Sequence, residues 1–409
     1  MGRLDTALVL GLLLGVVGCS GDASPGSSNG TPTGPVAPTN LSVSGKGTIA
    51  ARYTAEVWVQ GNYSYTSSWG TRVVNGVTTP GNTVYIWDVR GSVPALVDSI
   101  TVAGATTTGD VQASPDGKVL VVPTEPGPGS IVTYDLTNPV KPVRLATFTS
   151  AKITRGVHTC EIQVVNGRLT AFLAVNTGTS HPARLMIVDL GNPSAPQEVT
   201  TIDYGSSFVH DVYVRDGRLF VAQWDNGMIE YDIGGGGKGG TLAAPVEMAR
   251  LVTTGGKVHN IWWYHDGASG SKTYAFVGEE GPGAIFTGSS GDIHVVDLSA
   301  ATPREVAFFN VPGAGTHNFS VDEANGFLYA AYYNAGVQVL DVRGDLGSCT
   351  AVQKAADGRC DLQKMGRLKS TGLQDQGTGV YVWGVHFANG ALFASDMLAG
   401  LWRLAPAAR

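Results

Sequence analysis

Short stretches in which apolar and polar residues alternate recur along most of the chain. Such alternation places every second side chain on one face of an extended strand. One stretch recurs with an Asp near its end: VYIWDV at 84–89, IVTYDL at 131–136, LMIVDL at 185–190, MIEYDI at 228–233, IHVVDL at 293–298 and VQVLDV at 337–342. A seventh copy, LWRL at 401–404, lacks the Asp. No segment has a convincing helical period, so the pattern predicts an all-β protein built from repeats.

Two further strand-like runs precede most copies of this stretch. RLFVAQWDNG, FLYAAYYNAG and ALFASDMLAG exemplify the run directly ahead, and VHDVYVRDG, THNFSVDEANG and WGVHFANG the run before it. Asp-Gly and Asn-Gly pairs between such runs are typical of tight hairpins. Each unit of roughly 43 to 65 residues therefore indicates a four-stranded antiparallel blade, and we expect a β-propeller of about seven blades over residues 41–409.

The last unit stops after its third strand, and the segment LSVSGKGTIA at 41–50 can supply the missing outer strand. Pairing the two ends in this way would close the ring and leave no open sheet edge. The inner strands are expected to begin near Ala55, Gly109, His158, His210, His259, His317 and Trp383. The repeated Asp is expected to accept hydrogen bonds from backbone N–H groups of the turn that follows it.

LMIVDL followed by GNPSAP, and IHVVDL followed by SAATP, resemble the strand and turn of the LVIVD-repeat family. The resemblance covers nearly all of residues 41–409 and rests on six ordered copies. It implies a β-propeller body in a surface or secreted protein of bacteria or archaea, with a poorly defined biochemical role. The chain departs from the family pattern in its last blade, in the insert between Cys349 and Cys360, and in the GGGGKGG segment after Ile233.

Residues 1–18 have the pattern of a lipoprotein signal peptide. Arg3 supplies a positive charge, residues 7–17 form an apolar run too short to span a bilayer, and VVGC at 16–19 resembles a bacterial lipobox. That resemblance implies a lipid on Cys19. Residues 19–40 are rich in Gly, Ser, Pro, Thr and Asn and are expected to be a disordered tether. We therefore expect an exported protein that is lipid-anchored to the cell envelope, at the outer membrane.

Composition and charge narrow the class of partner. The net charge of −6 over 409 residues is mild and argues against nucleic acid. Only 15% of residues are charged and 56 are Gly, which suits an extracellular all-β protein with many turns. Cys349 and Cys360 are expected to form a disulfide outside the cytoplasm. Cys160 is expected to be a small buried apolar side chain.

Four histidines, His158, His210, His259 and His317, occupy matching positions at the start of the inner strand in four consecutive blades. Because inner strands line the channel, these side chains can converge at one mouth. Neutral imidazole is a good ligand for Zn, Cu or Fe, so a transition metal at this histidine ring is one hypothesis. A polar-ligand site and a purely structural role are the others, since four blades span a wide arc for one ion.

The loops between second and third strands should lie at the same mouth as these histidines. They carry Trp224, Asp225, Glu279, Glu280 and Phe286, together with Glu125 and His181. Loops on a rigid scaffold are usual binding sites, and aromatic residues among acidic ones suit a sugar, a peptide or a cation.

The sequence contains no nucleophile elbow, no HExxH motif and no phosphate-binding loop. We therefore expect a binding module for a protein, glycan or envelope component, with the membrane as a partner through the lipid anchor. The alternative is a metal-dependent hydrolase or oxidoreductase that uses the four histidines, and a purely structural envelope protein is a third possibility.

Overall fold

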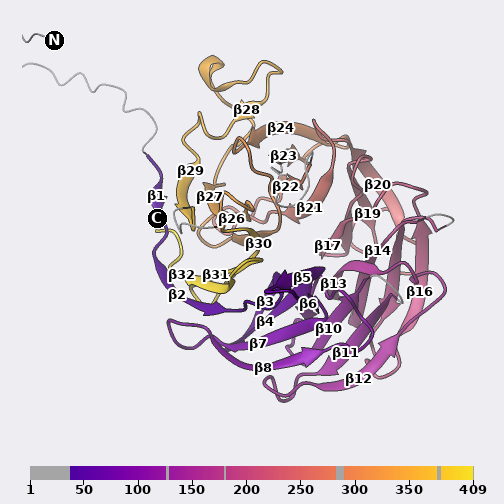
Figure 1. Ribbon diagram of the computed structural model, residues 1–409. Coiled ribbons are helices and arrows are strands. Elements are labelled where there is room, and N and C mark those ends of the chain that lie inside the picture. The colour runs from indigo at the N-terminus through magenta and orange to yellow at the C-terminus, as the bar shows by residue number, and fades with distance from the viewer. Residues whose placement is uncertain (1–36, 126–128, 179–180, 282–289, 375–378, 409) are drawn as a thin grey trace, which may run out of the picture. The chain divides into compact units, whose positions relative to one another are not determined.

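A computed structural model describes residues 37–408 except 126–128, 179–180, 282–289 and 375–378. The expected signal peptide, Cys19 and the first part of the expected tether lie outside these residues. Seven four-stranded antiparallel sheets surround a common centre, and in six of them the strands follow one another in chain order from the inside outward (Figure 1). The expectation of a seven-bladed, all-β propeller is confirmed.

The strands of the blades are these: blade 1, β3 (Tyr53–Gln60), β4 (Tyr63–Trp69), β7 (Thr83–Asp88) and β8 (Ala95–Thr101); blade 2, β9 (Gln112–Ala113), β10 (Val119–Thr124), β11 (Ser130–Asp135) and β12 (Val143–Phe148); blade 3, β13 (Val157–Val165), β14 (Arg168–Val175), β15 (Arg184–Asp189) and β16 (Gln197–Asp203); blade 4, β17 (Asp211–Arg215), β18 (Arg218–Ala222), β19 (Met228–Asp232) and β20 (Val246–Leu251). The remaining blades are these: blade 5, β21 (Val258–Trp263), β22 (Tyr274–Glu279), β23 (Ile293–Asp297) and β24 (Arg304–Phe309); blade 6, β25 (Phe319–Asp322), β26 (Phe327–Ala331), β27 (Val337–Asp341) and β29 (Leu368–Gly372); blade 7, β30 (Val382–Ala388), β31 (Ala391–Asp396), β32 (Gly400–Leu404) and β2 (Val43–Thr48).

The N-terminal strands close the ring. Strand β2 pairs antiparallel with β32, as the sequence predicted, so the outer strand of the last blade comes from the other end of the chain. The expected tether was drawn too long, because Thr39–Asn40 form strand β1, which pairs parallel with β29 of blade 6. Leu41 is buried among apolar side chains of blades 6 and 7, and this burial holds the segment in place.

The repeated Asp has the local role that the sequence predicted. Each copy ends the third strand of its blade and accepts a hydrogen bond from the backbone N–H two residues later; the copies are Asp88, Asp135, Asp189, Asp232, Asp297 and Asp341. The side chain replaces a backbone acceptor and starts the turn to the outer strand. The repeat is therefore a strand with its own turn signal.

Each blade buries an apolar face against the next. Phe172 and Leu185 of blade 3 pack with Val212 and Val221 of blade 4, for example. Full burial of one such side chain contributes about 1.5–3 kcal/mol, so these interfaces stabilise the ring. The inner strand of blade 2 starts later than expected, at Gln112, because the N–H of Val111 is taken by the Asp110 carboxylate instead of the ladder.

Three additions decorate the blades. A hairpin of β5 (Thr71–Val74) and β6 (Val77–Pro80) follows β4. The insert between β27 and β29 of blade 6 contains the 3-10 helix η1 (Ala351–Gln353) and strand β28 (Cys360–Asp361), which pairs parallel with β24. A disulfide joins Cys349 to Cys360 within this insert. Within the described residues no helix has the length and apolar character needed to cross a membrane.

Candidate functional site

Two inner strands carry a β-bulge at the position of a channel histidine. The register against the second strand shifts at His158 in blade 3 and at His259 in blade 5, and blades 1 and 7 have a shift at the equivalent place. A bulge sets two residues against one partner residue and re-aims their side chains. As a result His158 and the following Thr159 both line the channel.

The four predicted histidines form a continuous row of imidazoles. Successive ring centroids are 4.4 Å apart from His158 to His210, 3.8 Å from His210 to His259 and 3.9 Å from His259 to His317. The indole of Trp383 continues the row, 4.3 Å from His317. The imidazoles therefore lie closer together than a four-blade arc suggested, because all four side chains turn toward the axis.

Three of these imidazoles are buried without enough hydrogen-bond partners. Within the described residues no partner reaches Nδ1 of His210, either nitrogen of His259, or Nδ1 of His317. A buried polar atom in this state costs about 1–3 kcal/mol. Burial, reinforced by the neighbouring imidazoles, lowers the pKa of all three well below the usual histidine value. They are therefore neutral and have lone pairs to offer.

Glu125 and Glu280 reach the row from the loops that follow β10 and β22. An oxygen of Glu125 lies 3.0 Å from His158 Nδ1, and Asn176 donates to the same carboxylate. Burial opposes the charge on His158, but attraction to Glu125 raises the pKa of His158 above its usual value. Glu280 Oε2 lies 3.8 Å from His210 Nε2, and the Tyr333 hydroxyl donates to Glu280 Oε1 at 2.5 Å.

Aromatic side chains cover the row on the loop side. Trp224 stacks on His210 with ring centroids 5.3 Å apart, and Tyr333 lies 4.9 Å from His317. Both residues have positive φ, 40° and 42°, although neither is glycine. Bulky residues adopt this conformation only at a cost, and such strain gathers at functional sites.

The histidines surround a cavity of about 10 Å³. That volume is the size of one water molecule or one ion. A substrate molecule does not fit there, which weakens the hypothesis of a hydrolase or oxidoreductase centred on the row.

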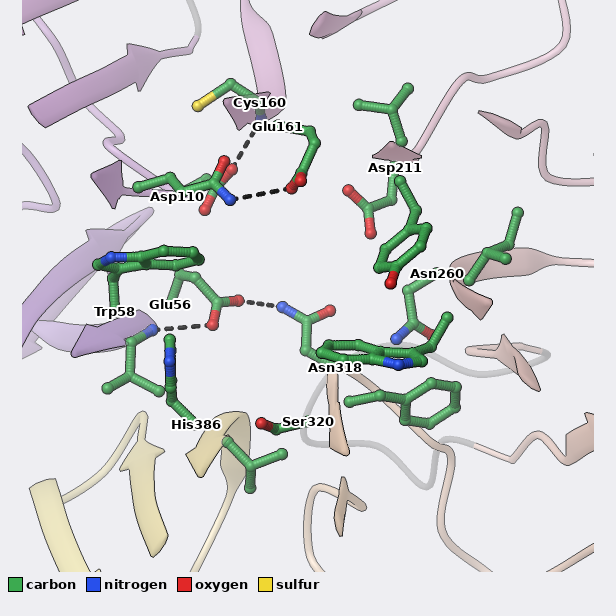
Figure 2. A pocket seen from close by; sticks show the side chains of 18 of the residues that line it. Glu56, Trp58, Asp110, Cys160, Glu161, Asp211, Asn260, Asn318, Ser320 and His386 are labelled. Carbon is green, nitrogen blue, oxygen red and sulfur yellow. Dashed lines mark hydrogen bonds between the residues drawn. The ribbon is translucent and has the colours of Figure 1, made fainter. Parts of the chain in front are cut away.

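A second and larger site lies in the channel beside this row (Figure 2). Its cavity of about 290 Å³ is lined by residues of all seven inner strands. The carboxyl groups of Glu56, Asp110, Glu161 and Asp211 point into one common space. Trp58, Trp262 and Tyr213 belong to its aromatic lining, and the lining residues that the structure describes include no lysine or arginine.

The four carboxyl groups of this channel pocket have raised pKa values. Burial, then repulsion from neighbouring carboxylates, raises the pKa of Glu56 to about 8 and that of Asp211 to about 7. Burial also raises the pKa of Glu161 to about 8 and that of Asp110 above its usual value. Burial is the largest cause in all four groups, and repulsion between neighbouring carboxylates adds to it at Glu56, Glu161 and Asp211.

The loop residues proposed from the sequence lie in different parts of the structure. Trp224 and Glu280 lie at the histidine row, whereas Asp225 is exposed and pairs with Lys257 on the rim. Glu279 was wrongly assigned to a binding loop: it is the last residue of β22, and its carboxylate contacts the buried His294. Phe286 lies outside the described residues.

Asn318 and Cys160 also line the channel pocket. The amide of Asn318 donates to Glu56. Cys160 is buried, and burial followed by repulsion from Asp110 raises the pKa of its thiol well above the usual value, so the thiol is unreactive. Sequence reasoning missed Glu56 and Glu161 as site residues. Acidic residues inside otherwise apolar inner strands were the available signal.

Fold and channel together define a seven-bladed β-propeller with a histidine row and an acidic pocket on its axis. The family model of the LVIVD repeat matches residues 51–74 and 181–203, so these two stretches carry the repeat that the sequence resembled. No curated protein matches it in sequence. Among solved structures, the crystal structure of the C-terminal WD40 domain of Sif2 is similar, with a TM-score of 0.51 and 11% identity over 87% of this chain and 82% of that chain. That likeness concerns the fold alone.

Proposed function

We propose that this propeller is an exported binding module and that the channel pocket receives its ligand. The observation that carries the proposal is the pocket itself, in which four buried carboxyl groups face one space of about 290 Å³. Its volume approaches that of ordinary small-ligand sites. The fold likeness to a WD40 domain supports an interaction or scaffold role.

The chemistry of the lining selects a compact cation as the ligand. Carboxylates bind guanidinium and ammonium groups through charge-assisted hydrogen bonds. The faces of Trp58 and Trp262 can add cation–π attraction, worth about 2 kcal/mol when desolvated. The ligand is therefore an arginine or lysine side chain of a partner protein, or a small amine.

Calorimetric titration with L-argininamide tests this proposal, with L-citrullinamide, which has the same α-amino group but an uncharged side-chain end, as the matched ligand. Binding should strengthen at least about tenfold from pH 6 to pH 9, because the carboxyls with pKa values of about 7 to 8 ionise in that range while guanidinium stays charged. The double variant Glu56→Gln, Asp211→Asn should lose this binding. Glu247→Gln, which removes an exposed acid on the outer strand of blade 4, should keep it.

Equal binding of both amides, or unchanged binding by the double variant, would reject the channel pocket as a cation site. Turnover of a substrate that disappears on substitution of the channel histidines would instead favour the enzyme alternative. Both results are readable from folded protein, because the substitutions keep side-chain size.

We also propose that a lipid on Cys19 holds the module at the outer membrane. Support comes from the apolar run and VVGC pattern of residues 7–19. Fractionation of the producing cells should find the wild type and a Cys160→Ala control in the membrane fraction. Cys19→Ala should appear in the soluble fraction and should not incorporate an alkyne-labelled fatty acid. A membrane-bound, unlabelled wild type would contradict the lipid anchor.

A further inference from the structure

The histidine row brings imidazole nitrogens and a carboxylate oxygen close enough together to hold one metal ion. One imidazole nitrogen each from His210 and His259 and one carboxylate oxygen of Glu280 all lie within 4.8 Å of one another. His158 Nε2 lies 3.0 Å from His210 Nε2. Ligands that surround a tetrahedral zinc ion at about 2.0–2.1 Å are themselves about 3.3 Å apart. The three-residue set is therefore compact enough to surround one ion, and His158 would join it by turning toward the ion from its place beside His210.

The unused nitrogens favour this interpretation over a purely structural one. A structural histidine normally has both ring nitrogens paired, as His294 has with Glu279 and Glu305. No described residue pairs with either nitrogen of His259 or with Nδ1 of His210. A cation bound at one nitrogen of His259 would supply a partner that this buried imidazole lacks.

The surrounding residues hold the ligands as supporting groups do in metal sites. A metal-binding histidine usually gives its other nitrogen to a carboxylate, which fixes its orientation. Glu125 does this for His158 at Nδ1 and leaves Nε2 directed at His210. The Tyr333 hydroxyl orients Glu280 in the same way.

We propose that His210, His259 and Glu280, with His158 as the fourth ligand, bind one divalent transition-metal ion, for which zinc is the best match. Three nitrogens and one oxygen are a ligand set that zinc accepts in tetrahedral geometry. The ion would join blades 3, 4 and 5 and act as a structural clamp.

Elemental analysis of the full exported chain, stripped with chelator, reloaded with zinc and freed of excess by gel filtration, tests the proposal. The wild type should retain about one zinc per chain. The double variant His210→Gln, His259→Gln should retain at least about tenfold less. His265→Gln, which changes a histidine outside the channel, should retain the wild-type amount.

Glu280→Gln provides a second variant that preserves size and is expected to fold. With cobalt in place of zinc, the wild type should show the visible absorption of a tetrahedral centre, and Glu280→Gln should change its position and intensity. Zinc should also raise the melting temperature of the wild type but not of the double variant. Failure of the wild type to retain zinc, or full retention by the folded double variant, would overturn the proposal. Neither result bears on the channel pocket, which uses other residues.

Discussion

Replacing Asp232 with Ala should destabilise the propeller far more than the same change at another repeat Asp. The carboxylate of Asp232 gathers five backbone N–H groups of the glycine-rich insert. Oδ1 accepts from Gly234, Gly235 and Gly236 at 2.8, 3.0 and 2.8 Å, and Oδ2 accepts from Lys238 and Gly240 at 2.6 and 3.1 Å. The insert that departs from the repeat pattern is thus wrapped around one buried side chain.

The size of the effect follows from these bonds. Gly235 also donates to the Gly217 carbonyl, so four N–H groups would lose the acceptor that holds them. At about 1 kcal/mol net for each bond, the free energy of unfolding should fall by about 4 kcal/mol. Asp189 accepts from one backbone N–H, that of Gly191, and pairs with the exposed side chain of Arg168, so Asp189→Ala should cost about 1 kcal/mol.

Urea unfolding of the two variants and the wild type, followed by tryptophan fluorescence, measures the difference. The loss of unfolding free energy in Asp232→Asn should lie between those of the two Ala variants, at about 2 kcal/mol. Its amide nitrogen would face the N–H groups of Lys238 and Gly240, while Oδ1 would still accept hydrogen bonds. Similar losses for Asp232→Ala and Asp189→Ala would refute the reasoning. That result would mean that the insert finds other partners for its N–H groups.

Two further predictions concern blade 5 and the insert packed on it. Burial opposes the charge on His294, but bonds to Glu279 and Glu305 raise its pKa to about 9, and attraction to His294 lowers the pKa of Glu305 to about 2. The pair should therefore lose its stabilising effect as the pH rises from about 6.5 to 9 and, separately, as it falls from about 4.5 to 2. The melting temperature of His294→Gln should approach that of the wild type above pH 9, and a constant gap from pH 6 to 10 would contradict this. The Cys349–Cys360 disulfide closes a short loop, so the double Cys→Ser variant should lose about 2–3 kcal/mol in the same urea assay, and an unchanged midpoint would show that the Arg359–Glu305 ion pair alone secures the insert.

The repeats could be predicted because their signals are local. A period of two defines each third strand, and the Asp at its end carries its own turn signal, so six copies needed no knowledge of distant contacts. The convergence of the four channel histidines could be predicted for a related reason. Equivalent positions in successive blades lie at the same height along the channel.

The channel pocket could not be predicted because it depends on the bulges. In an unbroken strand, Thr159 and His158 would face opposite sides, and so would His259 and Asn260. The bulge at the histidine position cancels that alternation and brings the next layer of side chains into the channel. Glu280 was recognised only as a loop acid, since its approach to His210 depends on the packing of blade 5 against blade 4.

The strands at the N-terminus have a mechanical meaning. Residues 39–48 run from the outer edge of blade 6 to the outer edge of blade 7, so a pull on the chain ahead of Thr39 loads these two blades before any other. The first bonds to bear the load are also the ones that keep the ring closed. Peeling away this segment, by tension or by a proteolytic cut, would leave β29 and β32 as bare edges able to pair with a neighbouring molecule. A partner that pulls on the body of the protein against a fixed N-terminus therefore loads the strand pairs that close the ring.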